Sequence, residues 1–295
     1  LAALIDPAER PKVARLLDEG WVEQLAIAAD AAQALAEALP LTNAQQVALD
    51  ELEAGPPGFR VSLLEGVTGS GKTELYLRRL RTTLDAGQQA LVLVPEISLT
   101  PQLTQRLRER LGSGVLSFHS AMNDGEREQA WLAAREGAAS VIVGTRSAIF
   151  VPFAKLGLIV VDEEHDPSYK QQDGFRYSAR DLAIVRAQHI KAEVILGSAT
   201  PSLESLHNAQ AGRYRHVRLM QRIHAQAPPQ IRLLDVRNQA LAHGLAAPML
   251  TALDRCLEAG DQALLFINRR GYAPVLLCHA CGWRAACTTC DARLT

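Results

Sequence analysis

The run Gly66–Thr73 matches the spacing of a phosphate-binding loop at every constrained position. Its residues are Gly66, Val67, Thr68, Gly69, Ser70, Gly71, Lys72 and Thr73. The glycines allow a backbone path in which successive N–H groups point into one concavity and can surround a triphosphate. Lys72 adds a positive charge for the β- and γ-phosphates, and the Thr73 hydroxyl is placed to ligate Mg²⁺. The run therefore predicts a nucleotide site, the alternative being a glycine-rich turn without a ligand.

An acidic cluster, Asp162-Glu163-Glu164-His165, follows the apolar run 158–161. A buried strand that ends in carboxylates downstream of a phosphate loop is typical of a hydrolytic site. In such a site Asp162 holds Mg²⁺, and Glu163 orients and polarises the water that attacks the γ-phosphate. The alternative is an ordinary acidic turn.

His165 and the hydroxyl-bearing triplet at 198–200 are predicted to link the nucleotide state to another surface, through hydrogen bonds that change on hydrolysis. The triplet consists of Ser198, Ala199 and Thr200. Upstream of the loop, Gln45 carries a paired donor and acceptor that can read an adenine edge. Gln45 is otherwise an exposed glutamine on a helix that begins near Thr42.

The segment 166–177 mixes aromatic and basic side chains directly after the acidic cluster. Aromatic rings stack on bases and basic groups hold phosphates, so this composition predicts a contact with single-stranded nucleic acid. The candidate DNA-binding residues are Tyr169, Lys170, Phe175, Arg176 and Tyr177. The alternative is an aromatic loop that packs on its own sheet.

Four cysteines near the end of the chain form two C-x-x-C pairs, namely Cys278, Cys281, Cys287 and Cys290. Paired C-x-x-C motifs in a reducing compartment are typical of thiolate zinc sites. Five residues between the two pairs are few for a single shared ion. The sequence therefore predicts zinc and leaves the geometry of its site open.

The elements that must position these residues alternate between strand and helix over residues 60–235, which predicts a mostly parallel sheet covered on both faces. Apolar runs predict strands at 60–64, 91–94, 115–118, 141–143, 158–161 and 194–196. Ligands bind at the carboxyl ends of such strands, where the chemically informative residues fall. Further strands are expected at 215–219, 230–234 and 263–267, with a helix at 248–259.

The overall composition limits how the protein can bind nucleic acid and where it can be located. The chain has 295 residues, 48% of them hydrophobic, and a net charge of −1, so nucleic-acid binding must come from local basic surface. It has no export leader and no apolar run long enough to cross a bilayer, which predicts a cytoplasmic location and no membrane partner. The chain begins at Leu1 and stops at Thr295 inside the cysteine-rich stretch, so we expect a piece of a longer protein.

These motifs together resemble a superfamily 2 helicase, and within that group the bacterial primosomal replication-restart helicases. The residues that carry this resemblance are Gly66–Glu74, Val94–Ile97, Asp162–His165, Gly197–Pro201, Asn268–Tyr272 and Leu277–Trp283. The resemblance implies an ATP-dependent 3′-5′ DNA helicase that couples ATP hydrolysis to movement on single-stranded DNA. It also implies forked DNA, single-stranded DNA-binding protein and primosome loading proteins as partners, near the bacterial nucleoid.

The resemblance further implies a domain plan. Residues 1–40 are expected to end a winged-helix DNA-binding region, 41–235 to form the ATP-binding helicase lobe 1, 236–277 to start lobe 2, and 278–295 to be part of a zinc-binding region. The family carries interleaved cysteine pairs on two zinc ions, so each site here would lack its other half. It supplies a transition-state arginine from lobe 2, and we therefore expect this chain to bind ATP but to hydrolyse it slowly.

Two other classes remain open from the residues alone. A phosphate-loop kinase or transporter ATPase would explain Gly66–Thr73, but neither chemistry requires the 198–200 hydroxyls or the aromatic segment. A zinc module that binds DNA or proteins, with the nucleotide acting only as a switch, would explain the cysteines. Separate measurements of ATP hydrolysis and DNA binding discriminate between these classes.

Overall fold

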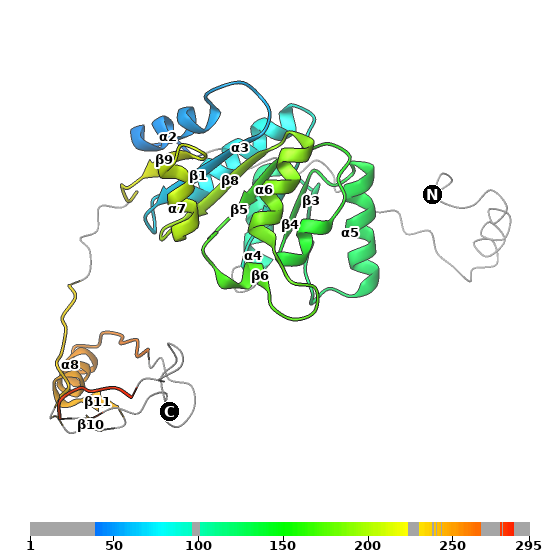
Figure 1. The fold of residues 1–295 in the computed structure, drawn as a ribbon. Coiled ribbons are helices and arrows are strands. Elements are labelled where there is room, and N and C mark those ends of the chain that lie inside the picture. Colours follow the sequence, from blue (N-terminus) through cyan, green and yellow to red (C-terminus); the bar gives the residue numbers. More distant parts are fainter. Residues whose placement is uncertain are drawn as a thin grey trace. The chain divides into compact units, whose positions relative to one another are not determined.

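The computed structural model describes residues 39–95, 101–223, 230–237, 239, 241–242, 244–266, 278 and 280–285. The chain falls into two compact units, Leu1–Gln226 and Ala227–Thr295. The first contains a seven-stranded sheet in the order β3-β4-β2-β5-β8-β1-β9, in which every neighbouring pair is parallel (Figure 1). Its strands are β1 Arg60–Gly66, β2 Gln89–Leu93, β3 Val115–Phe118, β4 Val141–Gly144, β5 Leu156–Val161, β8 Glu193–Ser198 and β9 Arg215–Leu219. The predicted parallel sheet is confirmed.

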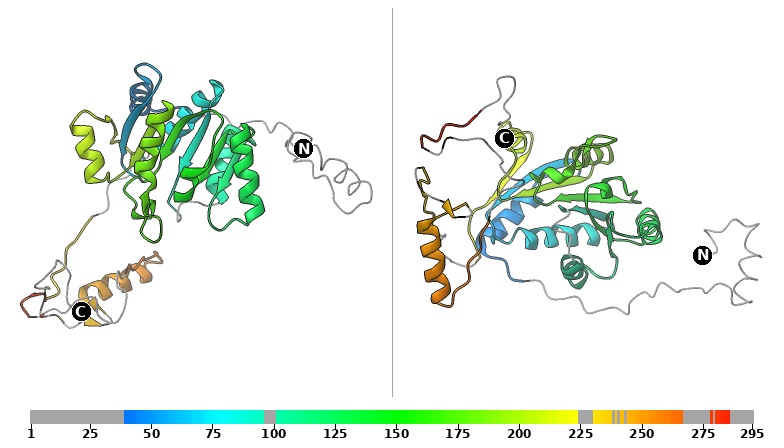
Figure 2. Two further views of the ribbon diagram at one scale, coloured as in Figure 1. Left: turned by 45° about the vertical axis from the view of Figure 1, so that its right-hand side comes forward. Right: turned by 90° about the horizontal axis from the view of Figure 1, so that it is seen from below.

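Two layers of helices cover the two faces of this sheet (Figure 2). One face packs against α2 Asn43–Glu53, α3 Lys72–Asp85 and α4 Pro101–Leu111, and the other against α5 Asp124–Glu136, α6 Ala179–Ile190 and α7 Leu203–Gln210. Successive strand residues point to opposite faces. Leu91 and Leu93 accordingly belong to one apolar cluster, while Ala90 and Val92 belong to the other. Both faces of the strands are buried, which explains their continuous apolar runs.

Parallel pairing brings the carboxyl ends of the strands to one edge of the sheet. Glu65 at the end of β1 is in register with Ser198 on β8. Val161 at the end of β5 is in register with Leu196 on β8 and with Leu93 on β2. The loops that follow β1, β5 and β8 therefore emerge side by side, and they carry the phosphate loop, the acidic cluster and the hydroxyl triplet.

Local signals set the starts of the helices beside this edge. Thr42 caps α2 in a capping box with Gln45, because each side chain hydrogen-bonds the other residue's backbone N–H. Gly71 precedes α3 in the left-handed region, at φ 89°, which favours glycine. Ser178 caps α6 by accepting a hydrogen bond from the Asp181 N–H.

A short excursion separates β5 from α6. It contains the single 3₁₀ turn Pro167–Tyr169 and a small antiparallel hairpin, β6 Lys170–Gln171 with β7 Tyr177–Ser178. The Arg146 guanidinium donates to the carbonyls of Ser168 and Lys170 from the 3₁₀ segment that follows β4. The aromatic segment is therefore anchored at its base to the same edge of the sheet.

The second unit is smaller. It contains the antiparallel pair β10 Leu241–Ala242 and β11 Leu245–Ala246, followed by α8 Ala247–Glu258 close to the predicted helix. The strand prediction at 230–234 is wrong: these residues form no strand with any other part of the chain that the structure describes, and Leu233 is 94% exposed. Residues 263–266 form no strand either. An extended apolar run becomes a strand only where another strand's hydrogen-bonding edge is available.

The region 1–38, expected to belong to a winged-helix domain, lies outside the described residues, as do Glu96 and Ile97. None of the helices in the described ranges has the length and apolar character that a bilayer-crossing segment needs.

Candidate nucleotide and DNA site

The phosphate loop connects β1 to α3 along the backbone path that its glycines permit. Gly69 and Gly71 both have positive φ values, 79° and 89°. The Ser70 N–H donates to the Val67 carbonyl at 3.0 Å, which closes the turn. The Lys72 ammonium folds over the loop and donates to the Gly66 carbonyl at 2.7 Å. The loop is thus preformed around its own lysine.

The loop fits a polyphosphate by two independent observations. A Cβ added to Gly66 would lie 2.8 Å from the Ser70 hydroxyl and 2.9 Å from Lys72 Cγ, so a side chain there would fill the concavity. The Ser70 hydroxyl is also buried with no hydrogen-bond partner in the described structure. A buried hydroxyl of this kind is costly unless a ligand or water satisfies it.

Gln45 supports the loop from α2. Its amide oxygen accepts from the Thr42 N–H at 2.9 Å, and its amide nitrogen donates to the Ser70 carbonyl at 3.0 Å. The residue is 3% exposed, so it is not the exposed glutamine of the alternative interpretation. A Cβ on Gly71 would overlap this amide. Gln45 therefore fixes the position of the loop, and its contact with adenine remains a prediction.

Asp162 directly follows β5 and lies beside α3, the helix that follows the phosphate loop. Its side chain accepts a hydrogen bond from the Tyr76 hydroxyl at 2.9 Å, and its N–H donates to the Leu93 carbonyl. Burial raises the pKa of the Asp162 carboxyl, while the Tyr76 hydrogen bond and the charge of Lys72 lower it. Burial, together with the neighbouring Asp162 charge, raises the pKa of Tyr76 well above its usual range. Thr73 lies one helical turn before Tyr76 and so shares its face of α3.

The position of Tyr76 also explains why residue 197 is a glycine. A Cβ placed on Gly197 would overlap the Tyr76 hydroxyl. Gly197 lies on β8, one residue before Ser198, and β8 pairs with both β1 and β5. The missing side chain makes room for a tyrosine that crosses from α3 to the carboxylate on β5.

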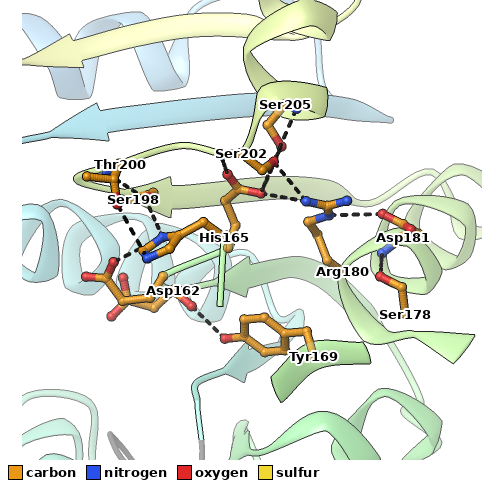
Figure 3. Close-up of polar contacts among 12 residues, drawn as sticks. Asp162, His165, Tyr169, Ser178, Arg180, Asp181, Ser198, Thr200, Ser202 and Ser205 are labelled. Carbon is orange, nitrogen blue, oxygen red and sulfur yellow. Dashed lines mark hydrogen bonds and ion pairs between the residues drawn. The ribbon is translucent and has the colours of Figure 1, made fainter. Parts of the chain in front are cut away.

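His165 lies next to Ser198 and Thr200 of the hydroxyl triplet (Figure 3), and a Glu163 carboxylate oxygen lies near the His165 ring. His165 Nδ1 is 2.7 Å from the Ser198 hydroxyl and 3.6 Å from a Glu163 carboxylate oxygen, and its Nε2 is 3.4 Å from the Thr200 hydroxyl. The Thr200 N–H donates to the Ser198 hydroxyl. The structure thus brings the predicted water-activating and coupling residues together at adjacent strand ends.

The third carboxylate of the cluster, Glu164, is buried and fully hydrogen-bonded. It accepts from the Ser202 N–H, from the Ser202 and Ser205 hydroxyls and from Arg180, at 2.7 to 3.1 Å. Sequence reasoning gave it no role. The acidic spacing alone could not separate Glu164 from Glu163, because the difference lies in which of the two side chains the turn after β5 buries.

The aromatic segment divides into a buried and an exposed part. Tyr169 is 2% exposed within the apolar core, and its hydroxyl donates to the Asp162 carbonyl at 2.6 Å. Its expected role as a base-stacking residue is therefore wrong for this conformation, because the ring has no free face. Phe175 is 77% exposed, with Lys170 and Arg176 also at the surface.

Tyr177 connects the exposed residues to the sheet. Its ring centroid is 4.9 Å from that of Phe150 and 6.0 Å from that of Phe175. A groove of about 560 Å³ runs beside this cluster, and its walls include Lys170, Arg176, Tyr177 and Arg180. Aromatic and cationic groups therefore share one open surface next to the acidic cluster.

The first cysteine pair lies in a tight turn. The Cys278 N–H donates to the Trp283 carbonyl at 2.7 Å, the Gly282 N–H donates to the Cys278 carbonyl at 2.9 Å, and Gly282 has φ 77°. Hydrogen bonds from the Cys281 N–H and thiol lower the pKa of the Cys278 thiol. This turn favours the thiolate, the form that binds metals. Cys287 and Cys290 lie outside the described residues, and the described ones include no cluster of three metal-binding side chains.

A phosphate loop, a carboxylate cluster and a hydroxyl triplet at the ends of β1, β5 and β8 define a RecA-like P-loop lobe of the helicase type. The family described as DEAD/DEAH box helicase matches residues 42–209, which is more than half of the chain. The chain belongs to this family.

The chain is also similar to individual curated proteins within this family. Replication restart protein PriA of Haemophilus influenzae is 50% identical over 253 residues, covering 86% of this chain and 34% of the relative. The PriA protein of Bacillus subtilis is 42% identical over 265 residues, covering 88% of this chain and 33% of the relative. The chain thus spans about a third of the length of these relatives. A solved structure of RecG bound to a three-way DNA junction matches with a TM-score of 0.45 and 22% identity, covering 78% of this chain and 27% of RecG.

A Cβ on Gly197 would overlap Tyr76, so substitutions at these two residues should affect the free energy of unfolding non-additively. We expect Gly197→Ala to destabilise the fold by about 1–3 kcal/mol through overpacking. We expect a smaller cost in the Tyr76→Phe background, which lacks the hydroxyl, so that the two substitutions couple by about 1 kcal/mol. Urea unfolding of the two single variants and the double variant measures this coupling, and strictly additive costs would contradict the packing described here.

Proposed function

We propose that this chain is the ATP-binding motor lobe of a replication-restart DNA helicase with 3′-5′ polarity. One observation supports this proposal above the others. The phosphate loop, Asp162–Glu163 and Ser198–Thr200 meet at one edge of the sheet, and an exposed aromatic and basic segment lies directly beside them. The similarity to PriA proteins supports the restart assignment. Those relatives are about three times as long, so the complete activity belongs to a longer polypeptide in this proposal.

In this proposal, different residues of the chain carry out different parts of ATP hydrolysis. The N–H groups of Gly66–Thr73 and the Lys72 ammonium bind the phosphates of ATP. Thr73 and Asp162 are the residues that would hold Mg²⁺, which would offset the negative charge of the phosphates. Glu163 is half-exposed, with 36% of its side chain accessible, so it can reach a water molecule. It orients that water and accepts its proton, while His165 and Thr200 respond to the change in charge.

A second set of residues holds the nucleic acid. Phe175 and Tyr177 offer ring faces to bases, and Lys170 and Arg176 offer positive charge to phosphates. Single-stranded and forked DNA are the proposed substrates. Single-stranded DNA-binding protein and primosome loading proteins are the proposed partners, and the proposed location is the bacterial cytoplasm at the nucleoid. The family resemblance supports these assignments.

Binding of ATP is tested at Lys72. We expect Lys72→Ala to weaken the binding of a fluorescent ATP analogue with Mg²⁺ by about 10- to 100-fold, the loss expected for a hydrogen bond to a charged group. Lys155→Ala is the matched control, because Lys155 is exposed and precedes β5 at the opposite edge of the sheet. Equal affinities for the Lys72→Ala variant and the wild type would overturn the nucleotide assignment.

Binding of DNA is tested at Phe175. Removal of a stacked ring should cost about 1–3 kcal/mol, so we expect Phe175→Ala to weaken binding of a labelled single-stranded oligonucleotide about 5-fold or more. Phe59→Ala is the control, since Phe59 is 39% exposed and precedes β1, away from the aromatic segment. Fluorescence anisotropy at a fixed salt concentration measures both variants, and a parallel loss in both would point to a general defect instead.

We also propose that the C-x-x-C pairs bind zinc in the complete protein. Cys278→Ser should lower the zinc content measured by mass spectrometry, because thiolate ligands are lost. Cys256→Ser should leave the zinc content unchanged, since Cys256 lies on α8 and its thiol points to the Gln262 carbonyl. An unchanged zinc content in Cys278→Ser would refute this assignment.

A further inference from the structure

Tyr76 connects the two elements that carry the proposed magnesium ligands. Thr73 lies in the first turn of α3, and Tyr76 follows it by one turn on the same face of this helix. Asp162 directly follows β5, and its carboxylate accepts a hydrogen bond from the Tyr76 hydroxyl at 2.9 Å. One side chain therefore joins the helix of the first ligand to the strand of the second.

The chemistry of the two groups fixes the direction of this hydrogen bond. An ionised carboxylate can only accept, and a phenol hydroxyl has one proton to donate. A carboxylate offers about four acceptor sites on its two oxygens, so a single hydrogen bond leaves room for a metal ion. The Tyr76 hydroxyl can therefore hold the Asp162 carboxylate in one orientation without occupying all of its ligand positions.

The Tyr76 ring is itself fixed by packing. The residue is 5% exposed, and its ring belongs to an apolar cluster that includes Leu64, Leu75 and Val160. A Cβ on Gly197 would overlap the Tyr76 hydroxyl, so β8 accommodates the hydroxyl only because it has no side chain at this position. A close-packed side chain of this kind has little freedom to move.

The main chain around Asp162 is also held in place. The Asp162 N–H donates to the Leu93 carbonyl at 2.9 Å, and the Glu164 N–H donates to the Gly197 carbonyl at 3.0 Å. These two hydrogen bonds attach the turn after β5 to β2 on one side and to β8 on the other. Since the backbone is fixed, the remaining freedom of Asp162 is rotation of its side chain, and the Tyr76 hydroxyl restricts that rotation.

We propose that Tyr76 is a positioning residue for the magnesium ion of this site: its hydroxyl holds the Asp162 carboxylate beside α3, so that Asp162 and Thr73 bind one ion together. Groups that hydrogen-bond to a metal ligand and orient it typically account for about 10- to 100-fold in metal affinity. Gly197 contributes by leaving space for the hydroxyl. This inference rests on the proposed function, because it concerns the metal of the same nucleotide site.

Three variants of the complete protein test the proposal. Tyr76→Phe removes only the hydroxyl, and its ring still fills the same core position. Gly197→Ala places a methyl group where the hydroxyl lies. Thr83→Val is the matched control, because Thr83 is a buried residue about two turns further along α3, and its hydroxyl donates to the Arg79 carbonyl at 2.8 Å.

The affinity for the metal is measured separately from catalysis. Binding of a fluorescent ATP analogue is followed while Mg²⁺ is added, and the Mg²⁺ concentration that gives half of the effect defines the metal requirement. Electron paramagnetic resonance of Mn²⁺ with the same analogue gives an independent value. Binding in EDTA reports on the phosphate loop alone. ATP hydrolysis over the same Mg²⁺ range and thermal unfolding are measured for each variant.

We expect Tyr76→Phe to raise the Mg²⁺ and Mn²⁺ requirements about 10-fold or more, and hydrolysis to recover at high Mg²⁺. Its affinity for the analogue in EDTA should stay within about 2-fold of wild type, because Lys72 and the loop N–H groups still hold the phosphates. Gly197→Ala should raise the requirement by itself, and by a smaller factor in the Tyr76→Phe background, where the hydroxyl is already absent. Thr83→Val should keep the wild-type requirement.

The outcomes separate this inference from the proposed function. A wild-type protein that does not bind the ATP analogue overturns the proposed function, and this inference with it. A wild type that requires Mg²⁺, combined with the same requirement in Tyr76→Phe, overturns the inference alone.

Two further results would also overturn the inference. A lower Mg²⁺ requirement in Tyr76→Phe would mean that the hydroxyl competes with the ion for the Asp162 carboxylate. A loss of the same factor in EDTA and in Mg²⁺ would mean that Tyr76 only supports the fold. Should Gly197→Ala fail to fold, Tyr76→Phe decides the question.

Discussion

Parallel pairing of β1, β5 and β8 is the constraint on which the rest of the structure depends. It requires both faces of the sheet to be covered, which assigns three helices to each side, and it places the carboxyl ends of these strands at one edge. The phosphate loop, the acidic cluster and the hydroxyl triplet are far apart along the sequence. They become neighbours only because the strands that precede them are aligned in register.

At that edge, burial gives three consecutive carboxylates different properties. Asp162 accepts a hydrogen bond from Tyr76, and burial raises the pKa of its carboxyl. Glu163 is half-exposed and turned outward by its left-handed backbone. Glu164 is buried inward on hydroxyl and guanidinium donors. One short stretch of chain thus places three carboxylates in three different environments.

The aromatic segment shows how a surface loop is connected to such a site. Lys170, Phe175 and Arg176 are exposed on the hairpin, whereas Tyr169 is buried and its hydroxyl donates to the Asp162 carbonyl. This arrangement separates the exposed part of the segment from the part that is fixed to the sheet. Loops that carry function are commonly held in this way by a rigid scaffold.

The sequence was sufficient for the features that local chemistry controls. The spacing of Gly66–Thr73 predicted the loop between strand and helix, and apolar runs predicted six of the seven strands of the parallel sheet. The segment 215–219 was expected as a connecting strand, and in the structure it joins the sheet beside β1. The sequence failed at 230–234, where an apolar run has no strand edge to pair with, and at Tyr169, whose ring is in the core instead of at the surface.

The sequence by itself therefore determined the nucleotide loop, the class of fold and the set of residues that can do chemistry, because glycine backbones, charge and hydrophobic periodicity act over a few residues. Only the tertiary structure decided which side of each strand end those residues face. That choice pairs Tyr76 with Asp162 across Gly197 and gives Glu164, not Glu163, to Arg180. Such contacts depend on distances between elements far apart in the chain, and no local pattern encodes them.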